Sequence, residues 1–581
     1  MIITGSYFKT AKSNSLLIAI FLFAIILRVS YFNSSPFGFD QIQIAENASA
    51  ITKGDVTLIG PRTGPADMFT GPLIYYVNAP FALFLNPAYA TIFATAFISL
   101  ITGVTIYFLT KKYLSTYYSF TVLILWGFSP LLIHFDRIPW NPNLTLIASA
   151  LTFFPLLKKQ RLNFIDSSLL SLGVLLGYQA HFSGILLPFF VSVALILRKE
   201  FKLIIFPVIG FIFTIIPTIL FDYRNNWLNY QGLLKLLSNK EAVSSYLIGL
   251  RILEKFYIII ETLGKVIFQG NSPSLYVCSG IYIVSAYTYI NSKKKELSAG
   301  NFTFTAPFLF IILTASIFSL YRNSTPEYYF FILLPCILYI WATVLIYVQI
   351  NNKHLFFVLL LQAALFVHSN YSKPQNLTIG YQYAVAQKIA QLSYITPISH
   401  IEYDIKPVDQ LGLQYFVKQN PPQLNSEGVS VHVTTPLANL HNNSYDIGIF
   451  SIWLDPRKTK NYSYLETPEF FIGIPENWKI AEQVIPPPNG NNELRYLLTV
   501  PYKESYPLTI VNNLPDHGSP TKDRIEDQVL EPIRLKSSDT QYWHAGKYQG
   551  NQGYYFESGS SQLFISLISK DELSLIEVHP R

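Results

Sequence analysis

Apolar runs separated by short charged patches occupy residues 14–370, whereas residues 371–581 have the mixed composition of a water-soluble protein. A helix needs roughly 20 mostly apolar residues to cross the hydrocarbon core of a bilayer. Only 13% of the residues are charged, against about 25% in a typical soluble protein. The pattern therefore predicts about eleven transmembrane helices. They are expected near residues 14–32, 88–110, 116–133, 143–157, 166–180, 182–197, 203–220, 274–291, 302–320, 328–347 and 354–369.

Basic residues orient the predicted helices, because loops rich in Lys and Arg stay in the cytoplasm. Such clusters precede the first predicted helix and follow the second, fourth, sixth, eighth and tenth, as Lys111–Lys112 and Lys293–Lys295 illustrate. Every second loop is basic, so we expect a cytoplasmic N-terminus and an extracytoplasmic C-terminal part. The same distribution argues against a nucleic-acid partner despite the net charge of +7, because the basic residues lie at helix ends instead of on one face.

The predicted fold class is a polytopic α-helical membrane protein of the cell membrane with a C-terminal soluble α/β domain. Residues 1–370 are the transmembrane domain, with a long first outer loop over 33–87, and residues 371–581 are the extracytoplasmic domain. In the soluble domain, helices are expected near 379–394 and 408–419, and strands near 428–434, 445–453 and 562–578. No catalytic constellation stands out there, so acceptor recognition or partner binding is its expected role.

One segment challenges the count of spans. Residues 252–268 are apolar enough for a helix, but four charged side chains would be costly in the middle of a bilayer, namely Glu254, Lys255, Glu261 and Lys265. Counting this segment as a span would also place the Lys293–Lys295 loop outside. Residues 231–268 are therefore predicted to form interfacial helices that lie along the outer surface.

Polar and ionisable residues concentrate in the outer loops, while the middles of the predicted helices carry almost none. An ion-coupled transporter usually has charges near the midplane, so we expect a site at the outer face instead. Such a site suits a substrate with a lipid tail and a phosphorylated head, because Arg or His can hold the phosphate. A carboxylate there could accept a proton or bind a divalent cation. The candidate residues are Asp40, Arg62, Asp136, Arg137, Asn141, His181, Arg224 and Arg322.

Several short motifs in these loops resemble one family. Phe39-Asp40-Gln41, Gly60-Pro61-Arg62 and Gly71-Pro72-Leu73-Ile74-Tyr75-Tyr76 resemble the first outer loop of bacterial family 39 glycosyltransferases, the protein-mannosyltransferase-like members of the GT-C fold class. The second outer loop of that family is similar to Arg137-Ile138-Pro139-Trp140-Asn141-Pro142-Asn143. Gly177-Tyr178-Gln179-Ala180-His181 and Tyr328-Tyr329-Phe330 are also similar to the family. The resemblance covers residues 14–370 and implies a GT-C-like fold.

The resemblance implies a hexosyl- or pentosyltransferase that takes a sugar from a polyprenyl-phosphate carrier and passes it, with inversion, to an extracytoplasmic glycan, lipid or protein. It implies that Asp40 is the base that deprotonates the acceptor. Asp136, His181 and Asn141 are second polar candidates, and the donor-phosphate candidates are Arg62, Arg137, Arg224 and Arg322. Many relatives have a second acidic residue where this chain has Gln41, and this difference counts against a metal site beside Asp40. A divalent cation is kept as an option, with its ligands unassigned.

Structural alternatives accompany these roles. Asp136 could pair with Arg137, Arg137 could reach lipid headgroups, and His181 could be a satisfied polar residue at a helix end. For the whole chain, two other functions stay open: a lipid or glycan transporter, and a membrane assembly protein whose outer domain binds partners.

Overall fold

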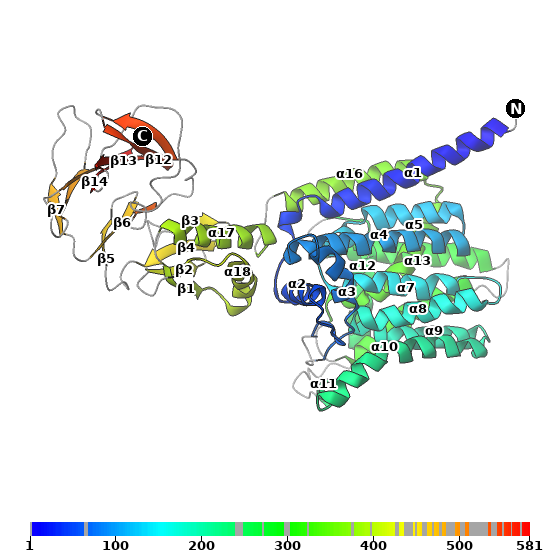
Figure 1. Ribbon diagram of the computed structural model, residues 1–581. Helices are drawn as coiled ribbons and strands as arrows, with labels where there is room; N and C mark the ends of the chain where they lie inside the picture. The colour runs from blue at the N-terminus through cyan, green and yellow to red at the C-terminus, as the bar shows by residue number, and fades with distance from the viewer. Residues whose placement is uncertain are drawn as a thin grey trace. The chain divides into compact units, whose positions relative to one another are not determined.

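The computed structural model divides the chain into two compact units, Met1–Lys373 and Pro374–Arg581 (Figure 1). In the first unit it describes residues 3–62, 68–238, 248–269, 272–295, 302–321 and 325–372. In the second it describes residues 377–395, 398–424, 429–434, 445–447, 450–455 and the separate strands β5 to β14.

Every segment predicted as an apolar helix in the first unit is helical. The long helices run side by side (Figure 1), and the short 3-10 segments η3, η4 and η5 lead into α9, α10 and α15. Their bounds are α1 (Ile3–Val29), α4 (Pro87–Tyr113), α5 (Thr116–Phe128), α6 (Pro130–Asp136), α7 (Leu144–Leu156), α8 (Phe164–Ala180), η3 (Phe182–Leu186), α9 (Leu187–Leu197), η4 (Phe201–Ile204), α10 (Ile205–Arg224), α13 (Pro273–Lys295), α14 (Phe302–Leu320), η5 (Glu327–Leu333), α15 (Leu334–Tyr347) and α16 (Asn352–Tyr371).

Length and composition mark the first unit as a membrane protein. Among the described residues, 4 helices are long and apolar enough to cross a bilayer: Pro87–Tyr113, Phe201–Arg224, Glu327–Tyr347 and Asn352–Tyr371. The bent pair α5 and α6 adds another if it forms one span. Shorter apolar helices cover Asn14–Val29, Phe164–Ala180, Phe182–Leu197 and Thr305–Leu320. The count of about eleven spans stays a prediction of the sequence.

A proline divides α5 from α6. Pro130 lacks the N–H that would continue the hydrogen-bond ladder of α5, and the two helices meet at an angle of 58°. Ser129 caps the new helix by accepting a hydrogen bond from the backbone N–H of Leu132. The short helix α6 then ends at Asp136, so the bend determines where Asp136 and Arg137 lie.

Two helices lie within the segment predicted as the first outer loop, α2 (Phe39–Thr52) and α3 (Leu73–Ala82). They lie together at one end of the long helices (Figure 1). A buried apolar cluster joins them to α4, α7 and α8, and its members are Ile44, Ile74, Tyr75, Ile98, Leu144 and Ala180. The loop is thus a packed cap over that end, which we call the Asp40 end.

The segment predicted to lie along the outer surface forms α11 (Leu228–Ser238) and α12 (Ile248–Lys265). The surface location is wrong for the C-terminal half of α12, where Ile259 and Leu263 are buried in the main core. Gly264 packs directly on the backbone of Tyr276 in α13, where a Cβ atom would overlap it. The charge of Lys265 is neutralised, because its amine forms ion pairs with Glu261 at 2.9 Å and with Glu327 at 3.3 Å. Burying this end of the helix is therefore less costly than the sequence suggested.

The second unit begins with α17 (Ile379–Ile395) and α18 (Pro407–Gln419), which lie beside a four-stranded sheet of order β1-β2-β4-β3. Its strands are β1 (Ile398–Asp404), β2 (Val429–Thr434), β3 (Tyr445–Ile447) and β4 (Phe450–Asp455). Three further sheets have the orders β10-β6-β5, β7-β8-β9 and β11-β12-β13-β14. Their strands are β5 (Tyr462–Glu466), β6 (Phe470–Pro475), β7 (Lys479–Gln483), β8 (Leu494–Thr499), β9 (Tyr506–Ile510), β10 (Ile533–Leu535), β11 (Trp543–Tyr548), β12 (Asn551–Ser558), β13 (Ser561–Ser569) and β14 (Glu572–Pro580).

Candidate functional site

Asp40 is the second residue of α2, and Gly38 forms the N-cap of this helix. Its carboxylate is partly buried, and it has no hydrogen bond or ion pair with any residue that the structure describes. Burial raises the pKa of Asp40 above the ordinary value of 3.8. The carboxylate interacts electrostatically with Tyr75 of α3 and Tyr328 of η5. A carboxylate with a raised pKa, and with no hydrogen bond or ion pair among the described residues, can accept a proton from a ligand.

Gln41 is the next residue of α2 after Asp40. Gln41 is 7% exposed, and its side chain makes two hydrogen bonds. Oε1 accepts from the backbone N–H of Gly38 at 2.9 Å, and Nε2 donates to the carbonyl of Pro139 at 2.9 Å. Gln41 therefore ties α2 to the loop after α6 and adds no carboxylate beside Asp40.

The loop after α6 is held by its two asparagines. Asn141 is buried and donates to the carbonyl of Ala180 at 2.5 Å. Asn143 donates to the carbonyl of Ile138 at 2.9 Å and accepts from the indole N–H of Trp140 at 2.8 Å. These bonds fix the position of Trp140 and join the loop to the C-terminal end of α8. The structure thus gives Asn141 a positioning role.

His181 follows α8 and is 7% exposed. Its Nδ1 accepts a hydrogen bond from the backbone N–H of Ser183 at 3.1 Å, so the hydrogen of the neutral ring is on Nε2. Burial lowers the pKa of His181 to about 4, which keeps the ring neutral at physiological pH. The ring packs edge-on against Tyr328 and Tyr329, with centroids 5.4 Å and 5.0 Å away.

Tyr328 connects these groups. Its ring centroid lies 4.7 Å from that of Trp140 and 5.4 Å from that of His181, and it interacts electrostatically with Asp40. Sequence reasoning named the Tyr328-Tyr329-Phe330 motif but placed neither tyrosine in the site. Asp40, Tyr75, Trp140, His181 and Tyr328 form what we call the Asp40 site.

Glycines let the first loop approach α8. Gly71 lies against the side chain of Gln179, and a Cβ at residue 71 would overlap that side chain. Gln179 in turn accepts from the backbone N–H of Leu73 at 3.3 Å and donates to Thr214 at 3.1 Å. A Cβ at Gly60 would likewise overlap the carbonyl of Gly71. The glycine motifs thus determine how closely the loop packs over the helix end.

Asp136 pairs with Arg28 and not with Arg137, which corrects the structural alternative expected from the sequence. Its Oδ2 accepts from the Arg28 Nε at 2.7 Å and from the Ser99 hydroxyl at 2.7 Å. The Arg28 side chain has no exposed surface and also donates to the carbonyls of Ala24, Trp126 and Gly127. Asp136 is therefore the counter-ion of a buried arginine.

Arg137 is 1% exposed and is directed at backbone carbonyls. Nη1 donates to Leu27 and Arg28 at 2.9 Å and 3.0 Å, and Nη2 donates to Tyr31 at 3.1 Å. These carbonyls lie at the C-terminal end of α1, where backbone acceptors lack partners within the helix. The guanidinium also lies 4.1 Å from the ring centroid of Tyr371. Arg137 therefore contacts protein groups, and neither phospholipid nor donor phosphate is needed to explain its burial.

The other arginines differ from Arg137. Arg62 and Arg224 both have exposed side chains. Arg62 forms a backbone bridge with Phe69, which packs on Phe221 of α10 at a centroid distance of 5.6 Å. Arg322 lies outside the described residues. Arg62 and Arg224 are thus exposed, whereas Arg137 is buried.

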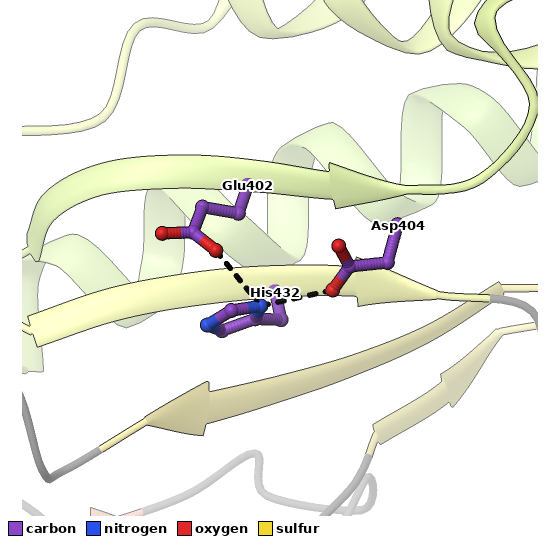
Figure 2. A group of neighbouring side chains, drawn as sticks. All are labelled: Glu402, Asp404 and His432. Carbon is purple, nitrogen blue, oxygen red and sulfur yellow. Dashed lines mark hydrogen bonds and ion pairs between the residues drawn. The ribbon is translucent and has the colours of Figure 1, made fainter.

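A separate group of metal-ligand types lies in the second unit. Among the described residues, Glu402, Asp404 and His432 place one ligand atom each within 4.8 Å of the others (Figure 2). Sequence reasoning missed them, because β1 was not predicted. The signal was the alternation in His400-Ile401-Glu402-Tyr403-Asp404, which puts every second, polar residue on one face of a strand.

No protein-family model and no curated protein matches the sequence. In structure, the chain is similar to ArnT from Cupriavidus metallidurans bound to undecaprenyl phosphate, at 12% identity over 76% of this chain and 98% of that chain, with a TM-score of 0.47. It is also similar to the archaeal oligosaccharyltransferase AglB from Archaeoglobus fulgidus in complex with an inhibitory peptide and a dolichol-phosphate, at 10% identity over 74% and 70% of the two chains, with a TM-score of 0.40.

A further similarity is to the Archaeoglobus fulgidus oligosaccharyltransferase in complex with zinc and sulfate, at 11% identity, with 73% of this chain and 59% of that chain covered and a TM-score of 0.38. These neighbours are transferases of the GT-C fold, the fold class that the loop motifs resemble.

Proposed function

We propose that this protein is an inverting glycosyltransferase that takes a sugar from a polyprenyl-phosphate carrier, with Asp40 as the catalytic base. One observation carries the proposal. Asp40 is a partly buried carboxylate of raised pKa with no hydrogen bond or ion pair among the described residues, at the end of a set of apolar helices. A group of this kind is costly to maintain unless a ligand uses it.

The proposed step transfers one sugar. The acceptor hydroxyl oxygen attacks the anomeric carbon and gives its proton to the Asp40 carboxylate. The bond between the anomeric carbon and the phosphate oxygen breaks, and its electron pair leaves with the polyprenyl phosphate. Attack from the side opposite the leaving group inverts the anomeric configuration. A base within hydrogen-bond reach of the hydroxyl accelerates such a step by about 10² to 10⁴-fold.

The other residues of the Asp40 site suit a sugar. Trp140 and Tyr328 offer aromatic surface, and aromatic rings combine an apolar face with a polar tip. His181 is neutral and holds its hydrogen on Nε2, so it can donate a hydrogen bond to a sugar oxygen. We assign the donor phosphate to Arg62 and Arg224, since their side chains are exposed and a guanidinium matches phosphate geometry.

The distribution of paired charges favours an enzyme over the alternative of a transporter. Arg28 and Asp136 meet at the Asp40 end of the helices. Lys112 and Lys158 both bind Asp166 at the other end, at 3.1 Å and 2.5 Å. A transporter is expected to place charges along a path between the two ends.

The ion pairs of Asp166 also indicate which end of the helices faces the cytoplasm. Lys112 and Lys158 come from two different basic loops, and both contact Asp166. Their meeting supports a cytoplasmic location for that end of the helices, since basic loops stay inside. We therefore propose a cytoplasmic N-terminus, an extracytoplasmic Asp40 end and an extracytoplasmic C-terminal domain. The acceptor, a glycan, lipid or protein, would then react outside the cytoplasm.

A transfer assay tests the proposal. The purified full-length protein is incubated with a panel of polyprenyl-phosphate hexoses and pentoses and a cell-envelope acceptor fraction, and the released polyprenyl phosphate is measured. Wild type is expected to release it from one of these donors, and Asp40→Asn to reduce the rate by about 10² to 10⁴-fold. Glu46→Gln is the matched control, because Glu46 is exposed on the same helix.

Two results would contradict the proposal. Near-full activity of Asp40→Asn would exclude Asp40 as the base. Movement of the lipid-linked sugar across a vesicle membrane without release of polyprenyl phosphate would instead identify a transporter.

A further inference from the structure

The first sheet of the second unit brings three ligand types onto one face. β1 and β2 are parallel, and their register pairs Glu402 with His432 and Asp404 with Thr434. Paired residues of neighbouring strands point to the same face, and so do residues two apart on one strand. Glu402 and Asp404 of β1 therefore flank His432 of β2, as Figure 2 shows.

Both carboxylates converge on one nitrogen. The Nδ1 of His432 lies 2.9 Å from Oδ2 of Asp404 and 3.4 Å from Oε2 of Glu402. An imidazole nitrogen has either one hydrogen or one lone pair, so it can donate fully to only one of these oxygens. Two anionic oxygens facing one nitrogen are better satisfied by a cation bound among all three atoms.

The spacing suits a metal ion. Zinc binds His nitrogen at about 2.0–2.1 Å and carboxylate oxygen at about 2.0–2.2 Å, which puts tetrahedral ligand atoms roughly 3.3 Å apart. The two separations from Nδ1 lie on either side of that value, and all three ligand atoms lie within 4.8 Å of one another. Small side-chain rotations would therefore close the ligand set without moving the strands.

A neighbouring histidine orients one ligand. The Nε2 of His400 lies 2.7 Å from Oε1 of Glu402, the oxygen that does not face His432. Ser430 of β2 contacts the same His400 nitrogen at 3.2 Å. Metal-binding carboxylates are commonly held by such outer hydrogen bonds. Glu402 thus has one oxygen held by His400 and the other directed at the cluster.

The cluster is open to solvent on the side of its carboxylates and buried on the side of its histidine. The His432 side chain is 8% exposed, while those of Glu402 and Asp404 are 32% and 53% exposed. A cation can enter from the carboxylate side and meet a nitrogen that is already positioned. An imidazole ligand favours a transition metal or zinc over magnesium or calcium, which prefer oxygen ligands alone.

We propose that Glu402, Asp404 and His432 bind one divalent zinc-like transition-metal cation, with His400 as the positioning residue for Glu402. Three protein ligands leave a coordination position for water or a ligand oxygen. The site belongs to the second unit and is independent of the catalytic role proposed for Asp40.

Zinc titration of the full-length protein tests this site. Detergent-solubilised protein is depleted of metal with a chelator, titrated with Zn²⁺ by calorimetry, and analysed for bound metal after desalting. Asp404→Asn removes the most exposed carboxylate ligand and is expected to weaken Zn²⁺ binding at least tenfold, since even the loss of an outer partner of a metal ligand costs roughly 10 to 100-fold. His432→Gln is expected to abolish tight binding, and Asp409→Asn in α18 is the matched control that should bind as wild type does.

Each outcome decides the assignment. One tight Zn²⁺ per chain that is weakened at least tenfold in Asp404→Asn and lost in His432→Gln, but kept in Asp409→Asn and in excess Mg²⁺, supports the site. Equal Zn²⁺ binding by wild type and Asp404→Asn would overturn it, as would the absence of tight binding to wild type. Displacement of Zn²⁺ by excess Mg²⁺ would overturn the choice of a transition metal.

Discussion

Asp40 and Asp136 are both aspartates near the same end of the long helices, but they differ in their partners. Asp136 and its neighbour Arg137 have partners within the protein. Asp136 binds Arg28 and Ser99, and Arg137 binds three carbonyls near the end of α1. Asp40 has no such partner among the described residues, and burial raises its pKa. A buried charge with partners holds the helices together, whereas a buried charge without them is suited to chemistry.

The largest stability effect should come from the partnered region. Asp136→Asn leaves the buried guanidinium of Arg28 without a counter-ion, and should lower the free energy of unfolding by about 3–5 kcal/mol. Thermal or chemical denaturation in detergent measures this loss. Glu46→Gln serves as the exposed control.

A double variant sharpens this prediction. Replacing both Arg28 and Asp136 by Leu removes the pair without leaving an unpaired charge, so it should recover much of the lost stability. If the double variant were as unstable as Asp136→Asn, the buried ion pair would not be the cause.

A smaller effect is expected where the first loop packs on α8. Gly71→Ala inserts a Cβ into space occupied by Gln179, and such overpacking costs about 1–3 kcal/mol. Gly38→Ala is the matched control, since its Cβ would come no closer than 3.7 Å to a neighbour. Equal stability of the two variants in the same denaturation assay would show that the close approach of Gly71 is unimportant.

The smallest expected effect near neutral pH is the change of kcat/KM with pH that comes from titration of Asp40. A base works only when it is deprotonated, so kcat/KM should fall as the pH drops through the pKa of Asp40. Because burial raises that pKa, the midpoint should lie above the ordinary value of 3.8. A pH–rate profile checks this, with tryptophan fluorescence recorded at each pH to confirm folding. A midpoint at or below 3.8 would remove the support that burial gives to Asp40 as the base.

Hydropathy was enough to predict the long apolar helices of the first unit, because each apolar run is local in sequence, but it did not predict α2 and α3 within the first outer loop. The pairing of Arg28 with Asp136 was not predictable, since the two residues are 108 positions apart and Arg137 was the nearer partner. The course of α12 was also missed, because Lys265 pairs with the distant Glu327 as well as with Glu261 of the same helix. Long-range partners decide which polar groups are buried, and a single sequence does not reveal them.

The candidate site, like the fold, could be predicted only in part from the sequence. The motifs around Asp40, Trp140, His181 and Tyr328 were visible in the sequence, but their grouping depends on packing between distant loops. The role of Gln41 was missed, because its bond to the Pro139 carbonyl spans 98 positions. The cluster of Glu402, Asp404 and His432 depends on the register between β1 and β2. This register could not be predicted, because β1 itself was not predicted.

The comparison of Asp40 with Asp136 leads to the most direct measurement. Asp40→Asn and Asp136→Asn are compared in the transfer assay, with turnover expressed per folded molecule and stability measured in parallel. We expect Asp40→Asn to keep wild-type stability and to lose about 10² to 10⁴-fold in turnover. Asp136→Asn should lose stability and keep the turnover of its folded fraction. Wild-type turnover in Asp40→Asn, or an equal loss in the folded fraction of Asp136→Asn, would contradict this expectation.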